Sequence, residues 1–120
     1  MEIDEILDYA LQLPDSEEST PFGPDTIVVK TNGKIFIVLN LRSEPISVNY
    51  KADPEQIIIQ KEDYPQFILP GYHMNKIHWN TLIINRQIPA KIVKDFIKTS
   101  HFLVSKKTKK KTPKSTKKSN

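Results

Sequence analysis

The sequence predicts an α+β domain: an antiparallel β-sheet flanked by an N-terminal, a middle and a C-terminal helix. Two β-rich runs flank Asn32–Gly33, which is the favoured residue pair for a two-residue hairpin turn. Residues 35–39 are apolar at every position, so this run is expected to be a central strand covered on both faces. Apolar residues at helical spacing lie near both ends of the chain, whose 120 residues suit one domain.

The first predicted element is an amphipathic helix. Its apolar face consists of Ile3, Ile6, Leu7, Ala10 and Leu11. Leu13–Pro14 should end this helix, because the residue before a proline is pushed out of helical geometry. Residues 14–25 contain three prolines and a glycine, and we predict a loop there.

A strand is expected over residues 44–51, where apolar and polar residues alternate strictly. This alternation places Ser47, Asn49 and Lys51 on its polar face.

The second half of the chain predicts two helices and one strand. Asp53 is a candidate N-cap for a helix over 54–62, with a proline at its first position. A loop over 63–73 and a strand over 81–85 follow. The last helix is expected to begin at Pro89 and to continue toward residue 103.

Composition bounds the class of protein. The chain has no cysteine, which excludes disulfides and thiolate metal sites. No apolar run approaches the ~20 residues that cross a bilayer, and the acidic N-terminus is unlike a signal peptide. We therefore expect a soluble, cytoplasmic protein.

Charge divides the chain into two parts. Residues 106–118 hold eight lysines and no acid, whereas residues 1–105 carry a net charge of −4. We predict a folded domain over 1–105 and a disordered lysine-rich tail over 106–120, which contains no apolar residue. Nucleic-acid affinity that comes from basic charge should therefore reside first in the tail.

Four sequence blocks resemble the MmcQ/YjbR family of small bacterial proteins: LPDSEESTPFGPD, VVKTNGKIFIVL, VNYKADPE and PGYHMNKIHWNTL. Their order and spacing agree with the family from the first helix to about residue 103. The departures are Ile77 within the last block, Tyr50 where a leucine is usual, and the lysine tail. The resemblance implies a frataxin-like (CyaY-like) α+β fold, also described as a double-wing DNA-binding fold, with DNA as a partner.

Residues 71–84 (GYHMNKIHWNTLII) combine aromatic and polar residues at unusual density. Trp79 and Met74 are expected to pack in the interior, and Asn75 is expected to cap a short turn. The polar residues of this stretch cannot all be buried cheaply, so several should lie together at the surface.

We therefore predict a surface whose side chains donate to phosphates and sugars. Its candidate residues are Asn49, Lys51, Tyr72, His73, Asn75, Lys76, His78, Asn80 and Arg86, together with the tail lysines Lys106, Lys107, Lys109, Lys110 and Lys111. The predicted function is weak, largely sequence-independent DNA binding by a monomer, through the rim of residues 72–80 and the tail. The alternative is a non-enzymatic domain that binds a protein or a small ligand.

No metal, cofactor or catalytic residue is predicted. His73 and His78 are five positions apart, which is about 140° around a helix or opposite faces of a strand. Neither arrangement directs both rings at one ion. The sequence also contains no nucleophile elbow, phosphate-binding loop or dinucleotide fingerprint, so we do not expect an enzyme.

Overall fold

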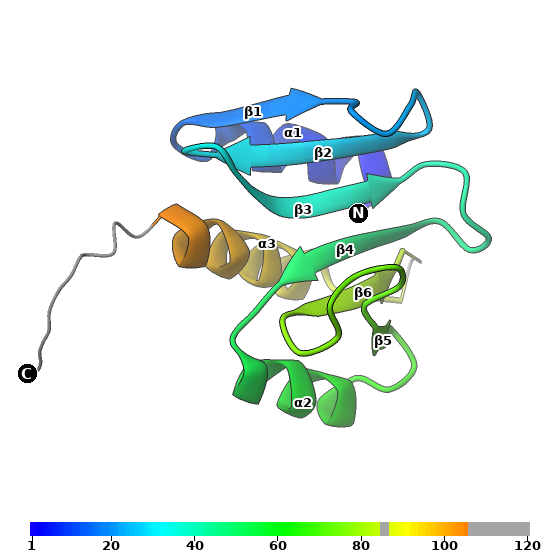
Figure 1. Ribbon diagram of the computed structural model, residues 1–120. Helices are drawn as coiled ribbons and strands as arrows, with labels where there is room; N and C mark the ends of the chain where they lie inside the picture. The colour runs from blue at the N-terminus through cyan, green and yellow to red at the C-terminus, as the bar shows by residue number, and fades with distance from the viewer. Residues whose placement is uncertain (85–86, 106–120) are drawn as a thin grey trace, which may run out of the picture.

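A six-stranded antiparallel sheet and three helices organise the chain (Figure 1) in a computed structural model that describes residues 1–84 and 87–105. The elements are α1 (Ile3–Gln12), β1 (Ser16–Ser19), β2 (Thr26–Thr31), β3 (Lys34–Asn40), β4 (Ser47–Lys51), α2 (Pro54–Asp63), β5 (Ile68–Pro70), β6 (Trp79–Ile83) and α3 (Ala90–Ser105). The strands lie in the order β1-β2-β3-β4-β6-β5. The predicted α+β class, with an N-terminal, a middle and a C-terminal helix beside an antiparallel sheet, is confirmed.

The β2–β3 hairpin has the predicted turn. Asn32 and Gly33 both adopt positive φ, at 53° and 76°, as a two-residue turn of this kind requires. β3 lies between β2 and β4, and its residues 36–39 are all buried. The expected central position of this strand is therefore confirmed.

One face of the sheet packs against α1 and α3, which lie behind it in Figure 1. The core there joins Ile6 of α1 and Ile97 of α3 to Leu39, Val48 and other apolar strand residues. Polar contacts also fix α3 on this face. Ser100 donates to the carbonyl of Lys51 at 2.5 Å, and the Nε2 of His101 donates to the carbonyl of Pro14 at 2.7 Å.

Four strands differ from the sequence prediction, and one of them, β4, begins at Ser47 rather than at the predicted residue 44. β1 lies within the predicted loop 14–25, because it forms by pairing with β2 and has no apolar pattern of its own. β5 has three residues and lies within the predicted loop 63–73. β6 covers residues 79–83, two positions earlier than the predicted 81–85.

The helix boundaries agree more closely with the prediction. α1 ends immediately before Leu13–Pro14, and α2 begins at Pro54 as expected. Asp53 occupies the N-cap position with an extended backbone, but its side chain makes no capping hydrogen bond, so that detail of the prediction is wrong. Among the described residues, no helix has the length and apolar character needed to span a membrane.

A candidate binding surface on the open face of the sheet

The face of the sheet opposite α1 and α3, here called the open face, carries polar residues at its centre. Asn49 of β4 pairs with Val38 of β3 on one side and with Thr81 of β6 on the other. Because side chains alternate along a strand, these three residues point away from the helices, whereas Tyr50 points toward them. The segment 71–78, which connects β5 to β6, contacts Asn49 and Thr81 and so lies over this face.

A closed ring of three hydrogen bonds holds the start of this segment. The Asn49 Nδ2 donates to the carbonyl of Tyr72 at 3.1 Å, and the amide of Tyr72 donates to the Thr81 Oγ1 at 2.8 Å. The Thr81 hydroxyl donates in turn to the Asn49 Oδ1 at 2.7 Å. Asn49 and Thr81 are both 3% exposed, so the ring lies in the interior. Tyr72 is therefore held by its main chain, and its side chain stays 62% exposed.

The rest of the segment is fixed by local contacts. The Asn75 Oδ1 accepts from the amide of Ile77 at 2.9 Å, and the Asn75 carbonyl accepts from Trp79 at 3.0 Å, so the predicted cap is confirmed. The Lys76 Nζ donates to the Gly71 carbonyl at 3.2 Å.

Two packing features complete the segment. A Cβ at Gly71 would lie 2.7 Å from the Trp79 carbonyl oxygen, so only glycine allows this close approach. His73 adopts a positive φ of 60°, and its ring lies 4.1 Å from that of Tyr72, centroid to centroid.

The structure separates the predicted site residues into exposed and buried groups. The exposed group agrees with the prediction and contains Tyr72, His73, Asn75, Lys76 and His78. Trp79 is buried, as expected, and Met74 is half-buried.

The expectation that Asn49 and Asn80 belong to an exposed rim is wrong. Asn49 is covered by the segment 71–78, which provides its hydrogen-bond partner. Asn80 is fully buried on the helix-covered face, where its Nδ2 donates to the carbonyl of Ile57 at 3.2 Å. Lys51 is half-buried, and its Nζ lies 5.8 Å from the centroid of the Trp79 ring. Arg86 and the tail lysines Lys106, Lys107, Lys109, Lys110 and Lys111 lie outside the described residues.

Two recesses lie side by side on the open face. The first recess has a volume of about 570 Å³ and is lined by Ser43, Glu44, Pro45, Ser47, Leu69, Pro70, Tyr72, Lys76, Thr81 and Ile83. The second recess has a volume of about 480 Å³ and is lined by Phe22, Asp25, Thr26, Ile35, Val38, Asn40, Arg42, Ser43, Asn49, Tyr72, His73 and Met74. Tyr72 and Ser43 line both recesses, and each volume falls in the range of small-ligand sites.

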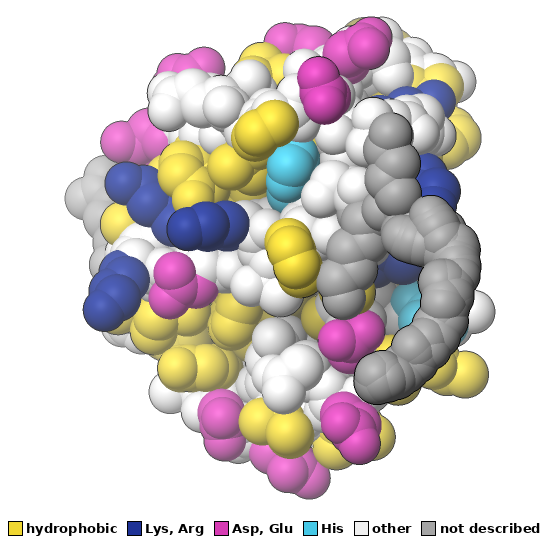
Figure 2. All heavy atoms as spheres, turned by 90° about the vertical axis from the view of Figure 1, so that its left-hand side faces the viewer, with side chains coloured by type: hydrophobic (Ala, Val, Ile, Leu, Met, Phe, Trp, Pro, Cys, Tyr) yellow, Lys and Arg dark blue, Asp and Glu magenta, His cyan; other side chains and the backbone are white. Residues whose placement is uncertain are grey.

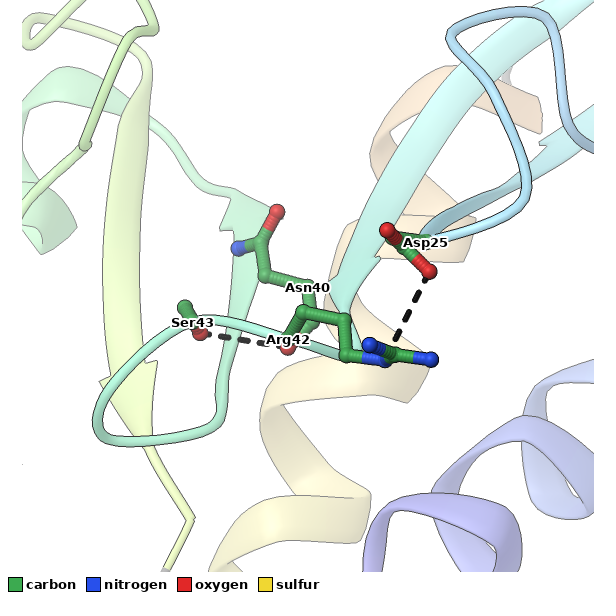
Figure 3. Close-up of polar contacts among 4 residues, drawn as sticks. All are labelled: Asp25, Asn40, Arg42 and Ser43. Carbon is green, nitrogen blue, oxygen red and sulfur yellow. Dashed lines mark hydrogen bonds and ion pairs between the residues drawn. The ribbon is translucent and has the colours of Figure 1, made fainter.

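Sequence reasoning missed the side of this surface formed by the β3–β4 loop (Figure 3). Arg42 points toward Asp25, with 3.6 Å between Nε and Oδ1, and both side chains are exposed. Ser43 donates to the carbonyl of Asn40 at 3.1 Å, which fixes the loop at the end of β3. Phe22 lies at the margin of the second recess and is 69% exposed. An aromatic residue within a proline- and glycine-rich loop was the available signal for Phe22, whereas nothing in the sequence connects Arg42 to the segment 71–78.

Four acidic side chains near the N-terminus lie away from the open face. Glu2, Asp4, Glu5 and Asp8 lie in or beside α1, which packs on the opposite face of the sheet. Figure 2 shows the end of the molecule seen at the left of Figure 1, where basic and acidic side chains are interspersed among apolar ones. The charged residues that line the two recesses are Arg42, Lys76, Asp25 and Glu44, so the recesses are close to neutral.

No three His, Asp or Glu side chains in residues 1–84 and 87–105 are placed to hold a metal ion together.

Comparison with known proteins places the chain in a family. The sequence model of the YjbR family matches residues 11–103. The chain belongs to the YjbR family. It is 42% identical over 96 residues to the uncharacterized protein YbdF of Escherichia coli O157:H7, covering 79% of this chain and 77% of that protein. It is 25% identical over 89 residues to the uncharacterized protein YjbR of Escherichia coli K12, covering 74% and 75%.

Solved structures agree with this assignment to the YjbR family. The Deinococcus radiodurans protein DR2400, described by a DUF419 domain, matches with a TM-score of 0.81 and 32% identity over 89% of this chain and 82% of that one. A Pseudomonas syringae protein matches with a TM-score of 0.74 and 26% identity over 87% and 99%. The matched YjbR region includes all the lining residues of both recesses, from Phe22 to Ile83. Both of these Escherichia coli relatives are uncharacterized, so their names assign no activity to this surface.

Proposed function

We propose that this protein binds DNA, weakly and largely without sequence preference, through the exposed side chains of the segment 71–78 and through its lysine-rich tail. The observation that carries this proposal is the hydrogen-bond ring at Tyr72, which fixes the main chain while leaving the neighbouring side chains in solvent. His73, Lys76 and His78 are exposed there, and their side chains are ordinary donors to phosphate oxygens. A fixed backbone lowers the entropy cost of presenting them.

Charge supports a division of the binding between the segment and the tail. If each of the eight tail lysines neutralises one phosphate, the log–log salt slope on duplex DNA is about −7. Lys76, the one lysine of the segment 71–78, adds only about −1 to this slope. The tail is therefore expected to dominate affinity at low salt, and the segment is expected to set how the folded domain sits on the backbone.

Fluorescence anisotropy with labelled duplex DNA across a salt series tests the proposal on the full-length protein. In a tail-neutral chain, glutamine replaces Lys106, Lys107, Lys109, Lys110, Lys111, Lys114, Lys117 and Lys118. A segment variant carries Lys76→Ala and His78→Ala and keeps Asn75, because Asn75 caps the turn. The matched control carries Lys98→Ala and Thr99→Ala, which are exposed on α3.

We expect the tail-neutral chain to keep measurable binding at low salt with a shallow salt slope. The segment variant should weaken that residual binding about 5- to 20-fold, because two charge-assisted contacts are lost. The control should match its parent within about twofold. Loss of all binding on neutralising the tail, or equal binding by the segment variant and the control, would remove the segment from the DNA interface.

A second candidate function follows from the recesses. Their volumes of about 570 and 480 Å³ suit a small ligand, which favours a non-enzymatic ligand-binding domain as the alternative. In either case we propose a monomeric, cytoplasmic binding protein rather than an enzyme. The absence of cysteine supports the location, and gel filtration with light scattering tests the monomer.

A further inference from the structure

We infer that the preferred ligand of the open face is single-stranded nucleic acid, with bases stacked on the rings of Tyr72 and Phe22 and lodged in the two recesses. This inference deepens the proposed function and rests on it. It names the form of nucleic acid that the folded domain recognises, apart from the attraction of the tail.

The ring of Tyr72 has the properties of a stacking platform. Its side chain is 62% exposed although the residue's amide and carbonyl are both hydrogen-bonded to interior side chains. The exposure therefore does not result from a loosely held loop. Stacking a base on an aromatic ring that is already positioned costs little ordering, and it accepts any base because every base has a π-face.

The recesses provide space for bases next to that ring. Tyr72 lines both recesses, and Phe22, which is 69% exposed, stands at the margin of the second one. The lining of the second recess includes Val38 and Ile35, and that of the first includes Leu69. Both recesses therefore offer apolar surface to a planar ring. In duplex DNA the base faces are covered by neighbouring base pairs, so only an unpaired strand presents them to such a surface.

Positive and negative charges are balanced within the two recesses. Each recess contains one permanent cation, Lys76 in the first and Arg42 in the second. Each also contains one carboxylate, Glu44 or Asp25, so the recesses have little net charge. Electrostatic attraction alone therefore cannot account for binding here. With at most two phosphates neutralised, the salt slope on a single strand should be only about −1.4.

The test uses the full-length tail-neutral chain, so that the tail lysines do not hide the domain. Its ligands are a labelled oligothymidylate of about a dozen nucleotides and the duplex of the same length. The variants are Tyr72→Ala, Tyr72→Phe and Phe22→Ala, and the matched control is Phe102→Ala, an aromatic that is 59% exposed on α3. Urea unfolding of each variant establishes that the domain remains folded.

We expect the tail-neutral chain to bind the single strand at least about tenfold more tightly than the duplex. Tyr72→Ala should weaken single-strand binding about 5- to 150-fold, and Phe22→Ala at least about fivefold. Tyr72→Phe keeps the ring and should stay within about twofold of its parent, as should Phe102→Ala.

Three outcomes would overturn the inference. Equal or tighter binding to the duplex would do so, as would a Tyr72→Ala variant that binds the single strand as well as Tyr72→Phe does. Failure of the tail-neutral chain to bind the single strand would also do so, and would favour a small ligand in the recesses. If the duplex is still bound and Lys76→Ala with His78→Ala weakens it, the proposed DNA function stands while the single-strand inference fails.

Discussion

Replacing Thr81 by valine should loosen the segment 71–78 and lower the stability of the whole domain. Valine has nearly the shape of threonine but no hydroxyl, so the change removes one hydrogen bond from the Tyr72 amide and one to the Asn49 Oδ1. Both groups are then left without their partner in the interior. Each unsatisfied buried group costs about 1–3 kcal/mol, and partial relaxation of the segment brings the expected total to about 2–4 kcal/mol. At a urea dependence of about 2 kcal/mol per molar, the midpoint falls by roughly 1–2 M.

Thr81→Ser is the matched control, because it keeps the hydroxyl and removes one methyl group at a cost of about 1 kcal/mol. Trp79 is the only tryptophan and lies on the same strand, so its fluorescence follows unfolding. Hydrogen exchange of the Tyr72 amide gives a local measurement, and its protection should fall in Thr81→Val but not in Thr81→Ser. If both variants unfold at the same urea concentration and protect this amide equally, the hydrogen-bond ring does not hold the segment.

Three further substitutions test separate parts of the structure. Gly71→Ala should lower the free energy of unfolding by about 1–3 kcal/mol in urea titrations, because its Cβ would meet the Trp79 backbone at 2.7 Å; a neutral effect would contradict this close approach. Gly33→Ala should cost about 1–2 kcal/mol because its φ of 76° is unfavourable for alanine, and a change below about 0.5 kcal/mol would argue against the positive-φ turn. Tyr50→Phe should cost about 1–2 kcal/mol at neutral pH, since the Gln60 Oε1 loses the phenol that donates to it at 2.6 Å. Burial, opposed in part by the hydrogen bond from Asn80, raises the pKa of Tyr50 far above its ordinary value, so the folded protein keeps the proton while the unfolded chain loses it above about pH 10. Stability should therefore fall as pH rises past about 10 in the parent, and less steeply in Tyr50→Phe; equal slopes for the two proteins would refute this linkage.

The parts of the fold that the sequence predicts are those with a local physical signal. Asn32–Gly33 favours positive φ without any help from the rest of the chain, and the apolar run that follows it has only one place in a sheet, between two other strands. β1 has no such signal. Three of its four residues are exposed, and it becomes a strand only because β2 offers an unpaired edge.

The binding surface was harder to predict because its contacts join distant parts of the chain. Asn49 has a polar side chain on an alternating strand, which correctly places it on the face away from Tyr50. Its burial depends on the Tyr72 carbonyl, 23 positions later, and no pattern near Asn49 reports that partner. Arg42 reaches the same surface through a loop whose sequence is ordinary. Local chemistry therefore indicated which residues are unusual, and tertiary pairing decided which of them face solvent.

The two outer strands have a consequence for association between copies of this protein. An unpaired strand edge is a template onto which another chain can add a strand. At one edge, β1 is four residues long and carries Glu17 and Glu18 side by side. At the other edge, β5 has three residues and ends at Pro70, which has no amide hydrogen to offer a new strand. Short length, like charge and a missing donor make both edges poor templates, so the sheet is protected against lateral growth into aggregates by the edge strands themselves.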